Sequence, residues 1–250
     1  MFEFRPGVPR DAVLKDIGVD ERLGAQAPPG LRFTDQDGRI VALGDYFGHG
    51  PVILTLNYYE CPMLCPTTFK NLVSTMDAMK GLRPGRDYRV VTVSVNPDER
   101  ASDVSSKADE VYNMMKTTPA PREAWAFLYG AEPEIGSLTR AVGYRYKKVE
   151  NGFAHPAVIM VLTPDGRVSR YLYGIEFDPM DVRLALIEAS GGKVGGSKVL
   201  NRALLFCYHY DPKGRKYAVA AMRLMKALGV ATIIFLGLLA VYLWRAAPAA

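Results

Sequence analysis

Two of the three cysteines in this chain of 250 residues stand close together, in the stretch NYYECPMLCP. Three residues separate Cys61 from Cys65, whereas dithiols built for disulfide exchange usually have two between them. The wider spacing still permits a disulfide, and it also lets two thiolates bind a soft metal ion such as Cu(I) or zinc. Because three cysteines are too few for a disulfide scaffold, the pair predicts a redox-active dithiol or a metal site.

The residues around the pair predict where it lies. A continuous apolar run, residues 51–59, precedes it and is typical of a central strand with both faces covered. From Pro66 onward the apolar residues recur at helical spacing, and proline suits the first turn of a helix. Cys65 should therefore lie at the helix N-terminus, where unpaired amides and the helix dipole favour a thiolate. We expect Cys65 to be the more acidic thiol.

A histidine can complete a metal site with this pair. The chain has three histidines, and His155, in GFAHPAVIM, stands where a loop enters a predicted strand. In a thioredoxin-like fold this segment packs beside the loop that carries the cysteines, so His155 can reach both thiols. An imidazole as third ligand would let the site hold Cu(II) as well as Cu(I). The alternative is a surface or core histidine with no ligand role.

The elements that must position these residues follow from the alternation of extended and helical patterns. Asp37-Gly38 and the sequence TPDGR each lie between two extended runs and predict two hairpins. This order predicts an α/β, thioredoxin-like domain over residues 26–190, with an added N-terminal hairpin, after a lead of residues 1–25. Its other predicted elements are strands over 88–95 and 125–130 and helices over 66–80, 100–116, 132–143 and 178–190.

The distribution of charged residues along the chain favours a membrane partner over nucleic acid. The net charge is +5 and the pI is near 9.0, but basic residues cluster only at the end of a linker and basic segment, residues 191–226. Residues 227–244, which follow, carry no charge and would span about 27 Å as a helix. We therefore expect a C-terminal transmembrane anchor and no nucleic-acid partner. A buried core helix is the alternative for this run.

Four stretches together resemble a known family: YYECPMLCP, VVTVSVNP, FAHPAVIMVLTPDGRVSRYLYGI and CYHYDPKGRKY. They are similar to the Sco (SenC/PrrC) family of thioredoxin-like copper chaperones, and in particular to a bacterial branch with a C-terminal extension. The resemblance extends from about residue 16 to residue 217. The CxxxC spacing alone is not specific, but its combination with the downstream histidine and these stretches is.

The resemblance implies that Cys61 and Cys65 match the metal-binding cysteines of the family and that His155 matches its histidine ligand. Members bind one Cu(I) or Cu(II) ion and support assembly of the binuclear copper centre of cytochrome c oxidase. They deliver copper or reduce the cysteines of that centre, so the implied role is that of a metallochaperone rather than an enzyme. The implied partner is the oxidase subunit with that centre, or another copper enzyme. Many members have Asp-Pro where this chain has Asn96-Pro97, and Asp98 is near enough to substitute.

The implied role also bears on localisation. Basic residues flank the predicted anchor mainly on its N-terminal side, so the positive-inside rule alone would place the domain in the cytoplasm. The N-terminus has no apolar segment typical of a secretory signal. Copper delivery to an oxidase, however, requires the opposite side. We expect the inner (cytoplasmic) membrane, with a C-terminal anchor and the soluble domain facing the periplasm or cell exterior.

Other residues and another function stay open. Met63, between the two cysteines, is a transient copper ligand or packs against an apolar neighbour. Cys207 and His209 form a CxH pair, which supplies only two ligands and is more typical of a structural or partner-facing role than of a second metal site. The alternative function is that of a membrane-tethered thiol-disulfide oxidoreductase, in which Cys61 or Cys65 attacks a partner disulfide and the other resolves it.

Overall fold

The computed structural model describes residues 16–60, 65–150, 152–194, 208–211, 216–219 and 232, and it describes only the backbone of residues 65, 66, 208–211 and 216–219. The chain divides into two compact units, residues 1–198 and 199–250. The first unit carries the predicted thioredoxin-like domain. In the second, β12 (Tyr208–Asp211) and β13 (Lys216–Val219) pair as an antiparallel hairpin.

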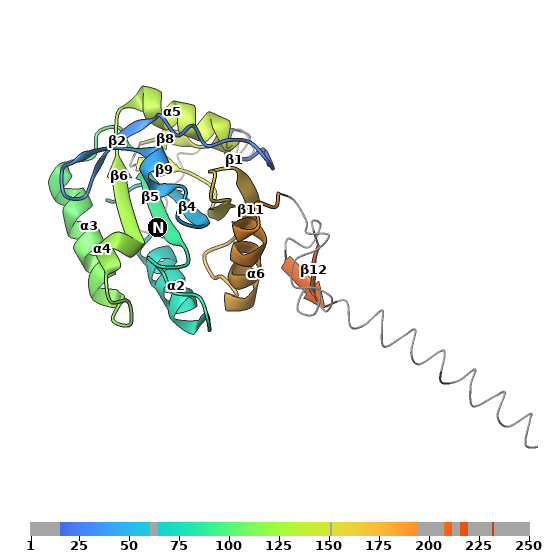
Figure 1. The fold of residues 1–250 in the computed structure, drawn as a ribbon. Coiled ribbons are helices and arrows are strands. Elements are labelled where there is room, and N and C mark those ends of the chain that lie inside the picture. The colour runs from blue at the N-terminus through green and yellow to red at the C-terminus, as the bar shows by residue number, and fades with distance from the viewer. Residues whose placement is uncertain are drawn as a thin grey trace, which may run out of the picture. The chain divides into compact units, whose positions relative to one another are not determined.

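A seven-stranded sheet forms the centre of the first unit, in the order β11-β10-β4-β5-β6-β2-β3 (Figure 1). The strands β4, β5 and β6 are parallel, and the other neighbours in the sheet are antiparallel. The seven strands are β2 (Arg32–Asp35), β3 (Ile40–Ala42), β4 (Val52–Asn57), β5 (Arg89–Ser94), β6 (Trp125–Tyr129), β10 (Val158–Leu162) and β11 (Val168–Tyr173).

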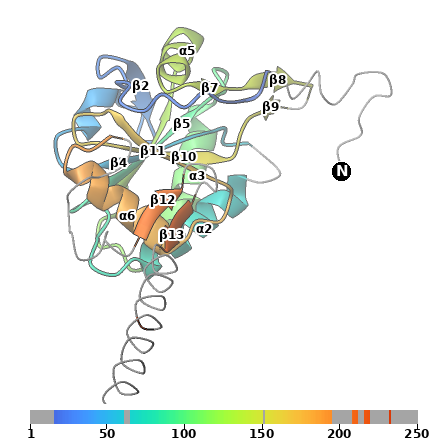
Figure 2. The same cartoon turned by 90° about the vertical axis from the view of Figure 1, so that its right-hand side faces the viewer.

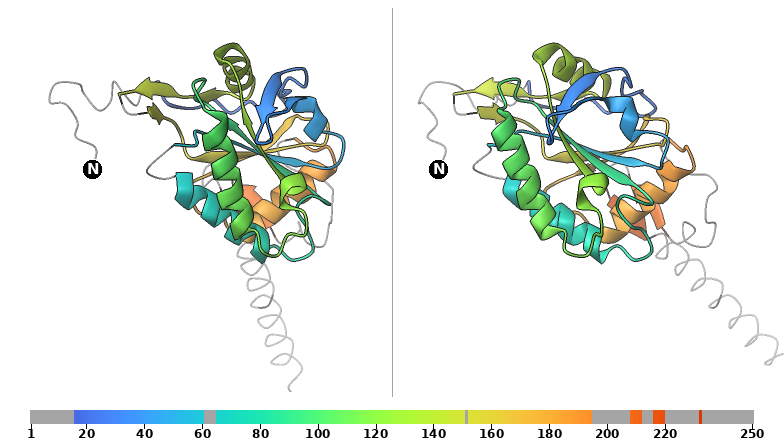
Figure 3. Two further views of the ribbon diagram at one scale, coloured as in Figure 1. Left: turned by 90° about the vertical axis from the view of Figure 1, so that its left-hand side faces the viewer. Right: turned by 60° about the vertical axis from the view of Figure 1, so that its left-hand side comes forward.

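Helices cover both faces of this sheet (Figures 1 and 3). The helices α2, α3 and α6 lie side by side on one face, and α5 lies on the other. All six residues of β4 are buried, which is why that strand has an almost continuously apolar sequence. The helices are η1 (Leu43–Tyr46, a 3-10 helix), α2 (Cys65–Ala78), α3 (Ala101–Met114), α4 (Pro121–Ala124), α5 (Glu132–Ala141) and α6 (Pro179–Ser190).

Aromatic side chains join α2 to the sheet. The rings of Trp125 and Phe127, two residues apart on β6, stack with centroids 5.5 Å apart. Phe69 of α2 meets both rings edge-on at 5.9 Å. The helical spacing predicted in this segment is confirmed, since its apolar residues are all buried: Phe69, Leu72, Val73, Met76 and Met79.

Both predicted hairpins are present. Gly38 at the β2–β3 turn has φ +78° and Gly166 at the β10–β11 turn has φ +83°, a backbone conformation that glycine adopts without steric penalty. The β2–β3 hairpin extends the sheet beyond β6, as predicted for an N-terminal addition. The short strands had no clear sequence signal: β1 (Gly18–Val19), β7 (Tyr144–Arg145), β8 (Lys147–Val149) and β9 (Gly152–Ala154).

These short strands make two small antiparallel pairs, β1 with β7 and β8 with β9. The β8–β9 pair is labelled in Figure 2. The second pair leads directly into His155.

The last helix of the first unit, α6, begins as predicted: the Asp178 side chain accepts hydrogen bonds from the Met180 and Asp181 amides. Within the described residues, no helix has the length and apolar character that a bilayer crossing needs. The predicted anchor, residues 227–244, lies outside the described residues apart from Thr232.

Candidate metal centre

The strand-to-helix connection after β4 carries the predicted thiols. The helix α2 begins at Cys65, so the backbone of this residue lies at a helix N-terminus, where a thiolate is favoured. Cys61 and Met63 lie outside the described residues, as does the side chain of Cys65. Their ligand and redox roles therefore stay predictions.

His155 lies at the same end of the sheet. It stands between β9 and β10, and β10 runs antiparallel to β4, so the start of β10 is beside the end of β4. The His155 ring is half-buried, and Tyr58 meets it edge-on with ring centroids 6.0 Å apart. Its Nδ1 lies 2.9 Å from Tyr144 Oη and 3.3 Å from the Pro156 carbonyl oxygen. The fold thus brings the candidate imidazole to the segment that leads into Cys61.

That segment is held firmly at Tyr59. Its buried hydroxyl donates to the Leu128 carbonyl at 2.8 Å, and its amide donates to Glu99 Oε1 at 2.8 Å. Burial, reinforced by the nearby Glu99 carboxylate, raises the pKa of Tyr59 well above its ordinary value, so the hydroxyl stays a hydrogen-bond donor. The residue two positions before Cys61 is therefore fastened to both β6 and the segment after β5.

Glu99 is a buried acid beside the cysteine segment, and no sequence signal pointed to it. Its Oε1 accepts hydrogen bonds from the Tyr59 amide and from Ser94 Oγ, at 2.8 and 2.7 Å. Its Oε2 is buried and has no hydrogen-bond partner among the described residues. Burial raises the pKa of Glu99, and the charges of Glu60 and Asp103 raise it further, against the two hydrogen bonds.

Asp98, the predicted substitute for the aspartate of the Asp-Pro motif, is in a different environment. Its side chain is 73 % exposed and pairs with Lys148 at 3.3 Å. The buried acid beside the cysteine segment is Glu99. No sequence signal distinguishes Asp98 from Glu99. The groups that donate hydrogen bonds to Glu99 belong to β5 and to the segment after β4, which are distinct parts of the chain.

Replacing Glu99 by Gln should change stability in a pH-dependent way. Folding raises the pKa of Glu99, so its favourable contribution is complete below the ordinary value of about 4.5 and is lost as the pH rises through the higher folded value. The amide of Glu99→Gln carries no charge at any of these pH values, so this variant should gain stability relative to wild type as the pH rises from 4 to 8. Urea unfolding of both metal-free proteins at several pH values measures the difference in their free energies of unfolding.

The matched control is Glu123→Gln, at an exposed glutamate. Any fixed packing effect of the amide at position 99 is the same at every pH and cancels from the comparison. If the difference in the free energy of unfolding between Glu99→Gln and wild type stayed constant from pH 4 to pH 8, this account would be contradicted.

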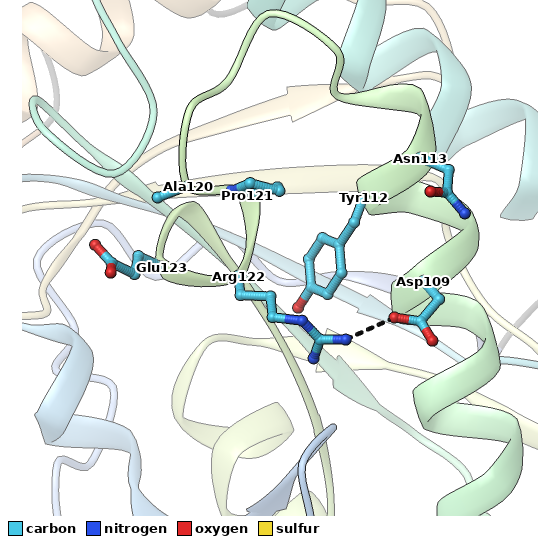
Figure 4. Close-up of a pocket in the computed structure, with 7 residues that line it drawn as sticks. All are labelled: Asp109, Tyr112, Asn113, Ala120, Pro121, Arg122 and Glu123. Atoms are coloured by element: carbon cyan, nitrogen blue, oxygen red, sulfur yellow. Dashed lines mark hydrogen bonds and ion pairs between the residues drawn. The ribbon is translucent and has the colours of Figure 1, made fainter.

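A pocket lies away from the candidate centre (Figure 4). It is formed by α3 and by α4, which precedes β6, so it lies at the amino end of that parallel strand, whereas Cys65 follows the carboxyl end of β4. Its cation, Arg122, pairs with Asp109 at 2.8 Å and with Asp37 at 2.7 Å and lies over the Tyr112 ring. Since both carboxylates neutralise Arg122, we do not assign a site there.

Among the described residues, no group of three or more His, Cys, Asp or Glu side chains could hold a metal ion. The two thiols of the predicted centre lie outside the described residues. Cys207 and the side chain of His209, the predicted CxH pair, also lie outside them.

Comparison with known proteins identifies the family. The SCO1/SenC family model matches residues 20–188, about two thirds of the chain. The chain belongs to the SCO1/SenC family. The family resemblance predicted from the four stretches is thereby confirmed. No curated protein sequence matches the chain significantly.

Solved structures agree with this membership. A putative electron transfer protein from Aquifex aeolicus VF5 has 25% identity and a TM-score of 0.61, and the match covers 68% of this chain and 95% of that one. Arabidopsis thaliana ScoI with copper bound has 22% identity and a TM-score of 0.53, with 66% and 99% covered. Yeast Sco1 with copper bound has 13% identity and a TM-score of 0.53, with 73% and 94% covered. This SCO1/SenC protein therefore has the predicted thioredoxin-like fold.

Proposed function

We propose that this SCO1/SenC protein is a membrane-anchored copper metallochaperone that binds one copper ion as cargo through Cys61, Cys65 and His155. The observation that carries the proposal is the position of His155 at the carboxyl end of β4, beside the segment that leads to the cysteines. Two thiolates and an imidazole match the preferences of Cu(I) and Cu(II). Family relatives from Arabidopsis thaliana and yeast have been solved with copper bound, which supports the choice of metal.

Ligand exchange is the mechanism that this donor set favours. Two soft thiolates and one imidazole hold copper tightly but leave a side on which an incoming thiolate or imidazole can displace a ligand. Each cysteine must lose its proton to bind copper, so binding releases protons. The proposed recipient is the copper-centre subunit of cytochrome c oxidase or another copper enzyme.

The proposed location is the inner membrane, with residues 227–244 as the anchor and the first unit in the periplasm or outside the cell. An uncharged run of this length and the aromatic residues Tyr242 and Trp244 near its end support the anchor. Fractionation of cells that produce the full chain, followed by protease treatment of spheroplasts, tests the anchor and its orientation. A soluble, protease-protected protein would contradict both.

A copper titration of the full chain tests the metal site. Wild type should bind one copper per chain, and its Cu(II) form should show a thiolate-to-copper charge-transfer band. His155→Ala should lose this band and bind Cu(II) at least about tenfold more weakly, because a third ligand is gone. Visible absorption with metal analysis measures both.

The chain supplies a matched control in His49→Ala. His49 is exposed and precedes β4, so it lies at the other end of that strand from the cysteine segment. This variant should titrate like wild type. No stoichiometric copper in wild type, or an equal loss in both variants, would contradict the proposed site.

The alternative function is a thiol-disulfide oxidoreductase. It is favoured by the start of α2 at Cys65, since a thiol at a helix N-terminus in a thioredoxin-like fold is suited to attack a disulfide. In that case either cysteine would be essential for reduction of a disulfide substrate, and His155→Ala would leave the activity intact. Copper binding and disulfide reduction, measured in the same cysteine and His155 variants, distinguish the two functions.

A further inference from the structure

The hydroxyl of Tyr144 contacts three polar atoms at the candidate centre. Its Oη lies 2.9 Å from the Leu56 carbonyl oxygen, 3.1 Å from the Pro156 carbonyl oxygen and 2.9 Å from His155 Nδ1. Leu56 is in β4, the strand before the cysteine segment, and Pro156 follows the candidate histidine. One buried side chain thus connects the two segments that carry the predicted ligands.

The Tyr144 hydroxyl lies where the pairing of β4 with β10 ends. The paired register between β4 and β10 ends at Thr55 and Ile159. Three residues before Ile159, Pro156 has no amide hydrogen, so no ladder hydrogen bond can form from that position. The Tyr144 hydroxyl lies between the Leu56 and Pro156 carbonyls and supplies a hydrogen-bond donor there.

A count of protons assigns the form of His155. A tyrosine hydroxyl has one proton to donate, and carbonyl oxygens only accept. If His155 Nδ1 had no proton, three acceptors would surround the single proton of Tyr144. With a proton on Nδ1, the tyrosine donates to a carbonyl and accepts from the imidazole, and the Pro156 carbonyl 3.3 Å from Nδ1 accepts as well. Of the two neutral tautomers, the contacts therefore favour the one with its proton on Nδ1.

We propose that Tyr144 is a positioning residue that holds His155 in the Nδ1-protonated form, so that Nε2 carries the lone pair and is the copper-binding nitrogen. This inference rests on the proposed function for its metal. A metal-binding histidine commonly donates its other ring N–H to a protein acceptor, which sets the tautomer and the ring orientation. Here the acceptors are Tyr144 Oη and the Pro156 carbonyl oxygen.

The surroundings keep Tyr144 in place. Its side chain is 3 % exposed, and its strand β7 pairs with β1. The edge-on contact of Tyr58 supports the imidazole ring independently of Tyr144. Loss of the Tyr144 hydroxyl should therefore change the proton position on His155 while the ring stays near its present place.

Nitrogen NMR of the metal-free full chain tests the inference directly. Long-range proton–nitrogen correlation spectra of ¹⁵N-histidine-labelled protein at pH 8 distinguish the two tautomers, and the His155→Ala variant assigns the signals. Wild-type His155 should have its proton on Nδ1. In Tyr144→Phe the other tautomer should become populated, and copper affinity should fall about tenfold.

The matched control is Tyr146→Phe. Tyr146 is two residues away, and its hydroxyl donates to Glu132 Oε1 at 3.3 Å instead of contacting His155. This variant should keep the wild-type tautomer and affinity. A merely structural role of Tyr144 would lower stability in Tyr144→Phe without moving the tautomer, and that result would overturn the inference.

The wild-type spectrum is decisive even if Tyr144→Phe does not fold. Stoichiometric copper binding together with a proton on Nε2 would overturn this inference and leave the proposed function standing. A protein that binds no copper would overturn the proposed function, and with it any copper-related role of Tyr144, whatever the tautomer of His155.

Discussion

Replacement of Cys61 or Cys65 by Ser should lower the affinity for Cu(I) by about a hundredfold or more. Structural zinc sites with four ligands have apparent binding free energies of about 10–16 kcal/mol, so one ligand contributes about 3 kcal/mol. That free energy corresponds to roughly a hundredfold in affinity. A serine hydroxyl cannot replace a thiolate, because Cu(I) prefers soft sulfur ligands. Competition against a chromogenic Cu(I) chelator measures the change.

The chain offers Cys207→Ser as the matched control. Cys207 is the third cysteine of the sequence and belongs to the second unit of the chain. Its replacement should leave Cu(I) affinity unchanged. If Cys207→Ser weakened copper binding as much as Cys61→Ser, the copper ligands would have to include the CxH pair, and the proposed centre would be wrong.

Replacement of Gly143 by Ala should lower the free energy of unfolding by about 3 kcal/mol. Gly143 has φ +69°, and a left-handed conformation costs an L-residue about 1–2 kcal/mol. A Cβ atom there would also overlap the backbone carbonyl of Asp20, whose amide donates to the Gly143 carbonyl at 2.8 Å. Since backbone must move to relieve this overlap, the pairing of β1 with β7 should be lost as well. Urea unfolding measures the difference.

Gly192→Ala separates the two contributions. Gly192 has the same φ of +69°, but a Cβ atom there would meet nothing within 4 Å. This variant should lose only the conformational part, about 1–2 kcal/mol. Equal losses in the two variants would mean that the approach of Asp20 to Gly143 contributes nothing. Because Tyr144 follows Gly143, the Gly143 variant should also bind copper more weakly.

The sequence by itself determined the fold class and the family. These depend on local patterns: the apolar run that becomes β4, the helical spacing that follows Pro66, and the turn at Gly38. Each pattern acts over a few residues, since strand and helix periodicities and glycine turns reflect local geometry. The residue types at 61, 65 and 155 also suggest thiol and imidazole chemistry, and this assignment stays a proposal.

The short strands β7, β8 and β9 could not be predicted in this way. Each has only two or three residues, so no periodicity develops in its sequence. They are strands only because another segment of the chain pairs with them, as β1 does with β7. The hairpin that leads into His155 therefore belongs to the tertiary structure.

Only the tertiary structure decided which groups contact the segment that leads to the cysteines. Glu99 meets the amide of Tyr59, 40 positions away, and Tyr144 meets Leu56, 88 positions away. Asp98, by contrast, is exposed although it is the neighbour of Glu99. Burial and hydrogen-bond partners depend on which distant segments pack together. The local sequence around a glutamate or tyrosine is the same whether its side chain becomes buried or exposed. The proton on His155 is decided in the same way, by acceptors that the fold brings to Nδ1.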